Sequence, residues 1–257
     1  MQRALITGAS SGIGRSFAET LAAEGYAVTL VARSEGRLNE LAKRLPGKEH
    51  RVLVADLAAE SEVERVCLEL EHTPYDLLIN NAGVGLYGPF ADSDWETLKQ
   101  LHRLNTEALL ALSFRYLRTA KAGNALINVA SVLGCLPFPH GGALYAASKA
   151  FVVSLSQALW EEQRKRGVYV MALCPGITET NFYAAAGGDP AKPPPRAMTQ
   201  TASEVVSETL AALSRRKLPV VVTGRTNRLL LFIMRFVSRR ATAKIMAKAK
   251  PHRRPTP

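Results

Sequence analysis

Residues 7–14 of this 257-residue chain read TGASSGIG. An apolar run at residues 4–6 precedes it, and apolar residues with helical spacing begin at Ile13. Glycines permit a tight turn and close backbone approach, and a helix N-terminus offers unpaired N–H groups to an anionic pyrophosphate. The spacing is G-x-x-x-G-x-G and departs from the usual G-x-G-x-x-G fingerprint. Because the turn lies between a strand and a helix, it still predicts a dinucleotide-binding loop.

The same alternation continues outward along the chain. Apolar runs typical of strands occupy residues 4–6, 27–31, 52–54, 77–79, 125–129 and 168–173. Stretches of helical periodicity follow the first three of them, at residues 13–23, 38–45 and 63–70. Strands that are apolar on both faces and separated by helices indicate a parallel sheet covered on both sides, and such crossovers are right-handed. The sequence therefore predicts an α/β fold with a single doubly wound, Rossmann-like parallel sheet.

The end of the second predicted strand bears on the choice of cofactor. An acidic residue about 20 positions beyond the glycines would bind a ribose 2′-hydroxyl and select NAD. This sequence has Arg33 there, and a guanidinium suits a 2′-phosphate, so the pattern favours NADP(H). A solvated arginine at a strand end is the alternative, and the nearby Glu35 weakens the assignment.

Tyr145 and Lys149 stand four residues apart and share one face of a predicted helix. A free tyrosine has a pKa near 10, which is too high for efficient proton transfer at neutral pH. A neighbouring ammonium group favours the phenolate and lowers that pKa. Alone, the pair would be better interpreted as a surface pair of an ordinary helix.

Seven motifs, all in the same order along the chain, resemble those of the short-chain dehydrogenase/reductase family. They are residues 7–14, Asp56, the NNAG segment at residues 80–83, Asn105, Ser131 in NVAS, Tyr145 with Lys149, and PGIT at residues 175–178. The resemblance covers about residues 1–225, which we expect to form the dinucleotide-binding and catalytic domain, and it extends to the DltE-like subgroup. It implies cofactor binding by Gly8, Ser10, Ser11, Gly12, Ile13, Gly14, Arg33, Asp56, Asn81, Ala82, Gly83, Tyr145, Lys149, Pro175, Gly176, Ile177 and Thr178.

The resemblance also implies four catalytic residues: Asn105, Ser131, Tyr145 and Lys149. Tyr145 would give a proton to a carbonyl oxygen as hydride arrives, or remove it in reverse. Lys149 would hold the nicotinamide ribose and lower the pKa of the phenol, Ser131 would hydrogen-bond the substrate oxygen, and Asn105 would hold a water that links Lys149 to solvent. We therefore expect an NADP(H)-dependent oxidoreductase that interconverts a carbonyl and a secondary alcohol.

The substrate class and the assembly are less closely defined. Apolar residues such as Leu136, Phe138 and Phe182 favour a small-molecule carbonyl or alcohol substrate that is apolar or acyl-like. The family resemblance suggests a homodimer or homotetramer built on the helices that carry Asn105 and Tyr145. The alternative from another class is a catalytically silent regulator or scaffold that binds NADP(H).

Composition excludes several other classes of protein. The first ten residues do not read as a signal peptide, no apolar run reaches the ~20 residues of a membrane span, and three scattered cysteines suggest no disulfide framework. We expect a reducing, cytoplasmic setting. No cluster has the spacing of metal ligands, so we predict no metal, and we interpret His140 as an ordinary loop residue.

The charge of the chain is concentrated at its end. The net charge is +11, yet the first 208 residues hold 20 basic and 22 acidic residues, and 13 basic and no acidic residues follow Glu208. This distribution argues against nucleic-acid binding over the whole protein. It marks residues 226–257 as a basic amphipathic C-terminal extension.

In that extension Arg228, Arg235, Arg239, Lys244 and Lys248 follow a helical stripe. The stripe predicts peripheral contact with an anionic membrane. A helix that packs over the substrate cleft or against another subunit is the alternative. The Pro-rich residues 184–195 are expected to form a loop, either a plain surface loop or a mobile flap over the site.

Overall fold

Seven parallel strands form the central sheet of the computed structural model, which describes residues 1–139 and 142–248. The strand order is β3-β2-β1-β4-β5-β6-β9. The strands are β1 (Arg3–Thr7), β2 (Ala27–Ala32), β3 (Arg51–Val54), β4 (Leu77–Asn80), β5 (Ala125–Val129), β6 (Tyr169–Cys174) and β9 (Val220–Val222). The order reverses between β1 and β4, as in other doubly wound sheets. The predicted fold class is therefore confirmed.

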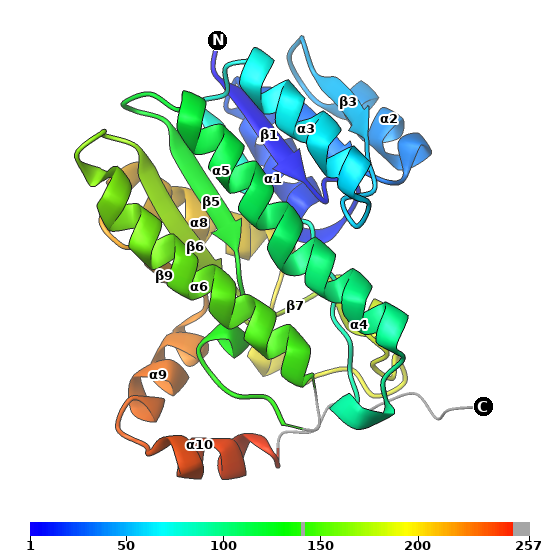
Figure 1. Ribbon diagram of the computed structural model, residues 1–257, viewed down its shortest axis with the longest axis vertical. Helices are drawn as coiled ribbons and strands as arrows, with labels where there is room; N and C mark the ends of the chain where they lie inside the picture. Colours follow the sequence, from blue (N-terminus) through cyan, green and yellow to red (C-terminus); the bar gives the residue numbers. More distant parts are fainter. Residues whose placement is uncertain (140–141, 249–257) are drawn as a thin grey trace.

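Helices cover both faces of this sheet (Figure 1). One face packs against α1 (Gly12–Ala23), α2 (Glu35–Arg44) and α8 (Ala202–Arg215). The other face packs against α3 (Glu60–His72), α5 (Leu109–Thr119) and α6 (Ala143–Arg164). The remaining helices are α4 (Trp95–His102), α7 (Phe182–Ala185), α9 (Arg225–Met234) and α10 (Arg239–Met246). A two-stranded sheet of β7 (Ile177–Thr178) and β8 (Thr199–Gln200) lies outside the central one.

Alternation of side chains along the strands explains why the predicted runs are apolar throughout. Ala4 and Ile6 of β1 belong to the apolar cluster on the α1 side, whereas Leu5 belongs to the cluster on the α3 side. Successive residues of a strand point to opposite faces. Both faces are therefore buried, which is why a parallel strand needs apolar residues at every position.

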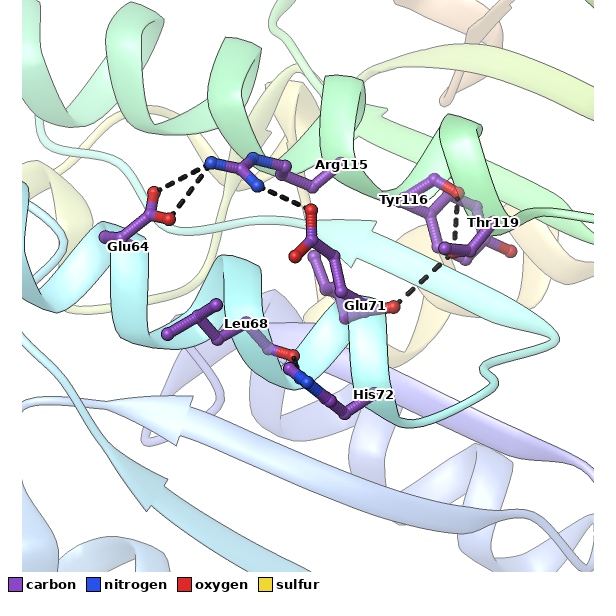
Figure 2. A network of polar contacts seen from close by, with 8 residues as sticks. Glu64, Leu68, Glu71, His72, Arg115, Tyr116 and Thr119 are labelled. Atoms are coloured by element: carbon purple, nitrogen blue, oxygen red, sulfur yellow. Dashed lines mark hydrogen bonds and ion pairs between the residues drawn. The ribbon is translucent and has the colours of Figure 1, made fainter.

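Charged side chains fasten α3 to α5 at the surface (Figure 2). The guanidinium of Arg115 donates to both oxygens of Glu64, at 3.0 and 3.2 Å, and also to Glu71. Thr119 donates to the carbonyl oxygen of Leu70 at 3.4 Å. The hydrogen bond from Arg115 holds the pKa of Glu71 below its usual value. These contacts join the C-terminal half of α5 to α3.

The structure differs from the sequence expectations at three places. The short strand β9 was not predicted, because its three valines follow a proline and make only a brief apolar run. Residues Arg103–Ala108, between α4 and α5, form a π-helical turn. The expected single C-terminal helix is two helices, because the Ser238 hydroxyl accepts a hydrogen bond from the amide of Ala241 and so caps a new helix.

The predicted loop at residues 184–195 is present, whereas part of the predicted C-terminal extension is not described. Residues 184–195 contain the end of α7 and otherwise form turns and irregular chain, which agrees with the expected loop. His140 and the last nine residues of the predicted extension lie outside the described residues. Within the described ranges, no helix is long and apolar enough to span a membrane.

Candidate active site

The turn between β1 and α1 is shaped by its glycines. Gly8 and Gly12 have φ angles of +66° and +55°, in the left-handed region that favours glycine. A Cβ atom on Gly14 would collide with the Gly8 carbonyl and lie 2.5 Å from Nδ2 of Asn81. The N-cap Ser11 makes no side-chain capping bond, so the first N–H groups of α1 have no capping oxygen. The loop is therefore compact and presents free amides, which fits a pyrophosphate.

Thr7 and Asn81 join this turn to the segment that follows β4. The Thr7 hydroxyl accepts hydrogen bonds from the amides of Asn81 and Ala82, both at 2.9 Å. The Asn81 side chain donates to the Thr7 carbonyl at 2.9 Å. The two predicted cofactor-binding loops thus form one rigid unit. Sequence reasoning assigned Thr7 no role of its own, and only its place at the end of a buried strand could have suggested one.

Arg33 and Asp56 lie at the carboxyl ends of the neighbouring strands β2 and β3. Their side chains approach to 3.9 Å, between Nη1 of Arg33 and Oδ2 of Asp56. The other Asp56 oxygen accepts from the amide of Ala58 at 3.0 Å, which fixes the carboxylate. Glu35 begins α2 and forms no ion pair with Arg33 in the described part of the chain. Arg33 is therefore exposed beside the glycine loop and free to meet an anionic group.

Ser131, Tyr145 and Lys149 come together beneath this edge of the sheet. Ser131 follows β5, and its hydroxyl accepts from the amide of Leu133 at 3.2 Å. Nζ of Lys149 donates to the carbonyl oxygen of Val129 at 2.8 Å and lies 5.9 Å from the centre of the Tyr145 ring. All three side chains are buried. The expected cluster of residues is thus present in one place.

Burial dominates the titration of these groups. It raises the pKa of Tyr145 well above its usual value, and a hydrogen bond with Ser131 opposes that rise. It lowers the pKa of Lys149 to about 8. The sequence analysis expected Lys149 to lower the pKa of Tyr145. In the folded chain the loss of hydration of the phenolate is the largest effect, and it raises the pKa of Tyr145.

Asn105 lies in the π-helical turn and faces the loop after β4. Its Oδ1 atom accepts from the amide of Val84, and its Nδ2 atom donates to the Val84 carbonyl, both at 2.9 Å. Nδ2 also donates to the Ser148 hydroxyl at 3.2 Å. The side chain therefore connects the β4 loop to α6 between Tyr145 and Lys149. These contacts hold the site together, while the expected bridging water remains a prediction.

Two buried asparagine side chains next to the site, which the sequence analysis did not identify, hydrogen-bond to surrounding helices. The Asn80 side chain donates to Oδ1 of Asn128 and to the Ser113 hydroxyl, both at 3.0 Å. Asn128 donates to the Ser156 hydroxyl at 3.1 Å. These bonds join β4, β5, α5 and α6. Polar residues at the ends of two apolar strands were the available signal.

The segment after β6 covers the site. The Pro175 carbonyl accepts from the amide of Val132 at 3.0 Å, next to Ser131. Thr180 lies against Gly12, where a Cβ would be 3.0 Å from its methyl group. The ring of Phe182 lies 5.7 Å from the ring of Tyr145, between centroids, and is tilted by 50° to it. Residues 175–182 thus connect the glycine loop to the buried phenol, while the contact of residues 175–178 with a nicotinamide stays a prediction.

Gly83 lies against the buried cluster, and the described residues contain no metal site. A Cβ on Gly83 would lie 3.1 Å from Oδ1 of Asn105 and 3.3 Å from Nζ of Lys149, so this residue of the NNAG segment lies directly against the buried cluster. Among the residues that the structure describes, no group of histidine, cysteine and acidic side chains is arranged to hold a metal ion.

Comparison with known proteins assigns the family. Residues 2–190 match the family described as short chain dehydrogenase. The chain belongs to the short-chain dehydrogenase family. An uncharacterized oxidoreductase of Staphylococcus saprophyticus is 35% identical over 184 residues, which cover 69% of this chain and 78% of that protein.

Two solved structures of this family resemble the fold closely. A short-chain dehydrogenase from Sphingobium yanoikuyae in complex with NADPH is 32% identical, with a TM-score of 0.79, and the match covers 93% of this chain and 97% of that one. A bulky-bulky ketone specific alcohol dehydrogenase from Comamonas testosteroni is 30% identical, with a TM-score of 0.75, and the match covers 91% and 92%.

Membership in the short-chain dehydrogenase family fixes the class of reaction. The chain is an oxidoreductase that acts on CH–OH or C=O groups of small molecules with a nicotinamide cofactor. A side chain at Gly8 or Gly14 would collide with Asn81 and neighbouring backbone, so the glycines let the turn pack closely against the segment after β4. The relation to the DltE-like subgroup stays a prediction.

Proposed function

We propose that this short-chain dehydrogenase is NADP(H)-dependent and interconverts a bulky apolar ketone and its secondary alcohol, with Tyr145 as the acid and base. The observation that carries the proposal is the buried cluster of Ser131, Tyr145 and Lys149 at the carboxyl edge of the sheet, next to the glycine turn. Together with Asn105, these are four buried polar side chains. Their burial costs free energy of hydration, and a scaffold protein without catalytic activity would gain nothing from it.

NADPH supplies a hydride when it is bound. Gly8, Gly12 and the amides at the start of α1 would hold its pyrophosphate, with Ser10, Ser11, Ile13 and Gly14 around them. Arg33 would bind the 2′-phosphate, and Asp56 would lie near the adenine. The segment after β4 would contact the cofactor through Asn81, Ala82 and Gly83. The segment after β6 would lie against the nicotinamide through Pro175, Gly176, Ile177 and Thr178.

The chain's own residues would manage the proton. Tyr145 would donate its phenolic proton to the carbonyl oxygen, which Ser131 would hold by a hydrogen bond. Lys149, with its pKa lowered to about 8, is partly uncharged at mildly alkaline pH and would exchange a proton with the phenol or with solvent. General acid–base catalysis of this kind contributes about 10²- to 10⁴-fold in rate.

Aromatic side chains around Tyr145 support a bulky apolar substrate. Tyr87 lies 6.4 Å from Phe138 and 5.7 Å from Tyr183, between ring centroids. Phe182 covers the phenol. A wall of this composition binds apolar surface and offers few hydrogen bonds. The Comamonas testosteroni relative, named for bulky-bulky ketones, supports the same class of substrate.

Apolar residues on α5 and α6 support assembly into a homodimer or homotetramer. Leu110, Phe114 and Phe151 remain exposed on these two helices. These three side chains would form part of the contact between subunits. We place the enzyme in the cytoplasm, with its basic C-terminal extension in peripheral contact with an anionic membrane.

The test is a screen of NADPH oxidation against bulky apolar ketones, followed by the same assay on two variants. Tyr145→Phe should lose at least about 100-fold in kcat. The control Tyr26→Phe, at a half-buried tyrosine outside the site, should keep its activity. Full turnover by Tyr145→Phe would exclude the mechanism, and NADPH binding without any turnover would favour the scaffold.

A further inference from the structure

The C-terminal helices α9 and α10 pack near Tyr145, at what we call the substrate end of the molecule. Met246 of α10 is buried in one apolar cluster with Leu136, Phe138 and Ala146, and Leu230 and Met234 of α9 pack against it. Figure 1 shows both helices at the end toward which the strands point. These contacts form the inner side of the extension, and they bring it beside the residue that follows Tyr145.

The opposite side of α9 and of the turn that follows it is also apolar, and it is exposed among the residues that the structure describes. Leu229, Phe232, Ile233 and Phe236 are 52–79% exposed, and they follow the i, i+3, i+4, i+7 spacing of one helical stripe. Ile245 of α10 is 45% exposed. The rings of Phe232 and Phe236 pack against each other at 5.5 Å. We call these five residues the outer face.

Basic side chains surround the outer face without acidic partners. Arg228 is bound to Glu208 of α8 at 2.9 Å. Within residues 1–139 and 142–248, by contrast, Arg235, Arg239, Arg240, Lys244 and Lys248 form no ion pair. All five are exposed. The outer face therefore lies on two helices and their adjoining turns, which also carry five exposed basic side chains.

We propose that the outer face docks on an anionic lipid membrane, with the phenylalanine and leucine side chains inserted between the headgroups. Helices that lie in a membrane interface combine an apolar stripe with lysine and arginine on the flanking surface, as here. Each basic residue near an anionic leaflet adds to the attraction. A second copy of this chain fits less well, because two such faces would bring only positive charges together.

Docking would turn the substrate end toward the lipid. The inner side of the same two helices contacts residues around Leu136 and Phe138, which follow Ser131 in the chain. A ketone dissolved in the membrane would then reach the site around Tyr145 without crossing bulk water. This orientation rests on the proposed reductase activity, whereas the docking rests only on the proposed membrane contact of the extension.

Co-sedimentation with vesicles of phosphatidylcholine, with or without 30% phosphatidylglycerol, tests the docking on the full chain. We expect binding to the anionic vesicles only, reduced about tenfold or more at 0.5 M salt by screening. The variant Phe232→Ser/Phe236→Ser should lose at least about tenfold in the partition coefficient, because it removes the buried apolar area. Arg235→Glu/Arg239→Glu/Arg240→Glu should lose a similar factor.

Matched controls change the same residue types elsewhere. Leu68→Ser/Trp95→Ser removes exposed apolar residues on α3 and α4, and Lys43→Glu/Lys48→Glu/Lys165→Glu reverses three exposed charges. Both should bind vesicles like the wild type. NADPH titration and circular dichroism establish that each variant is folded. Reductase activity on a water-soluble ketone tests the proposed function separately, since it needs no vesicles.

Three results would overturn the proposal. The first is the absence of binding to anionic vesicles, and the second is equal binding by the outer-face variants and the wild type. The third is a loss of dimer mass in the Phe232→Ser/Phe236→Ser variant with vesicle binding unchanged, which would assign the outer face to a second copy.

Discussion

The guanidinium of Arg33 lies 3.9 Å from the carboxylate of Asp56, measured from Nη1 to Oδ2, at the ends of adjacent strands. The two residues are 23 positions apart, and the register of β2 with β3 brings them together. The carboxylate restrains the arginine at the point where a 2′-phosphate would arrive. Both side chains remain largely exposed, so the pair itself adds little stability.

Replacement of Arg33 should therefore change cofactor choice without unfolding the chain. Arg33→Ala should weaken NADPH binding by about 10- to 100-fold, because a charge-assisted contact contributes about 1.5–3 kcal/mol. NADH binding should change by less than about twofold, since it lacks the phosphate that Arg33 contacts. Fluorescence titration with both cofactors at low and high salt measures this. An unchanged NADPH preference would rule out the role of Arg33.

A methyl group at Gly14 should disrupt the glycine turn. The added Cβ of Gly14→Ala would collide with backbone at Gly8 and with the amide of Asn81. We expect loss of NADPH binding by about 100-fold or more, or failure to fold, because overpacking of this kind costs about 1–3 kcal/mol or more. Gly36→Ala is the control, since nothing lies within 4 Å of its added Cβ. Equal NADPH affinity of both variants would contradict the close approach.

The buried ammonium of Lys149 should make stability depend on pH. Its pKa is about 8 in the fold and near 10.5 in the unfolded chain, so between these values the unfolded chain binds more protons. Stability then rises with pH from about 8 toward 10, and the cost of the buried charge is fully present below pH 8. Lys149→Met removes this rise.

Denaturant titrations of wild type and Lys149→Met at pH 7.5 and 9.5 measure the difference. The free energy of unfolding of the wild type should gain on the order of 1–2 kcal/mol relative to the variant over this range. The range ends below pH 10 because Tyr145, whose pKa is raised by burial, contributes in the opposite direction above it. Parallel curves for the two proteins would show that Lys149 has no lowered pKa.

Removal of the Asn105 side chain should loosen the β4 loop. Asn105→Ala leaves the backbone amide and carbonyl of Val84 without their partners, and it also breaks the bond to Ser148. We expect a loss of about 2–4 kcal/mol in the free energy of unfolding, since unpaired buried groups each cost about 1–3 kcal/mol. Asn39→Ala, on the exposed surface of α2, should change it by less than about 0.5 kcal/mol. If Asn105→Ala changed the free energy of unfolding as little as Asn39→Ala does, the hydrogen bonds of Asn105 would not stabilise the β4 loop.

Negative charge introduced on α5 should dissociate the proposed homodimer or homotetramer. Phe114 is 57% exposed, and its ring lies 5.6 Å below the guanidinium of Arg118. Leu110→Glu/Phe114→Glu should convert the oligomer to a monomer, because a buried unpaired carboxylate costs several kcal/mol. Mass measurement in solution follows the change, and Leu68→Glu, on α3, serves as the control. An unchanged mass would place the interface elsewhere.

Local sequence was sufficient for much of the site. The glycine turn, the Tyr145–Lys149 pair and Arg33 each depend on spacing within a few residues of a strand or a helix, so a linear pattern reveals them. The parallel sheet could be predicted for the same reason, because its strands must be apolar at every position. The short β9 lacked enough residues to give such a pattern.

Contacts between distant segments were decided only by the tertiary structure. The bonds of Thr7 to Asn81 and Ala82 join residues more than 70 positions apart, and those of Asn105 depend on a π-helical turn that no periodicity indicated. Burial reversed the expected direction of the Tyr145 pKa, since hydration is lost only when the chain surrounds the phenol.

The C-terminal extension shows the division most plainly. Its sequence by itself determined the charge, with no acidic residue after Glu208, and a helix-forming apolar pattern. Which apolar residues turn inward was decided by the fold, because α9 is apolar on two sides and only one of them meets the cluster around Leu136 and Phe138. A helical pattern specifies a stripe, whereas the partner that covers the stripe comes from elements far away in the chain.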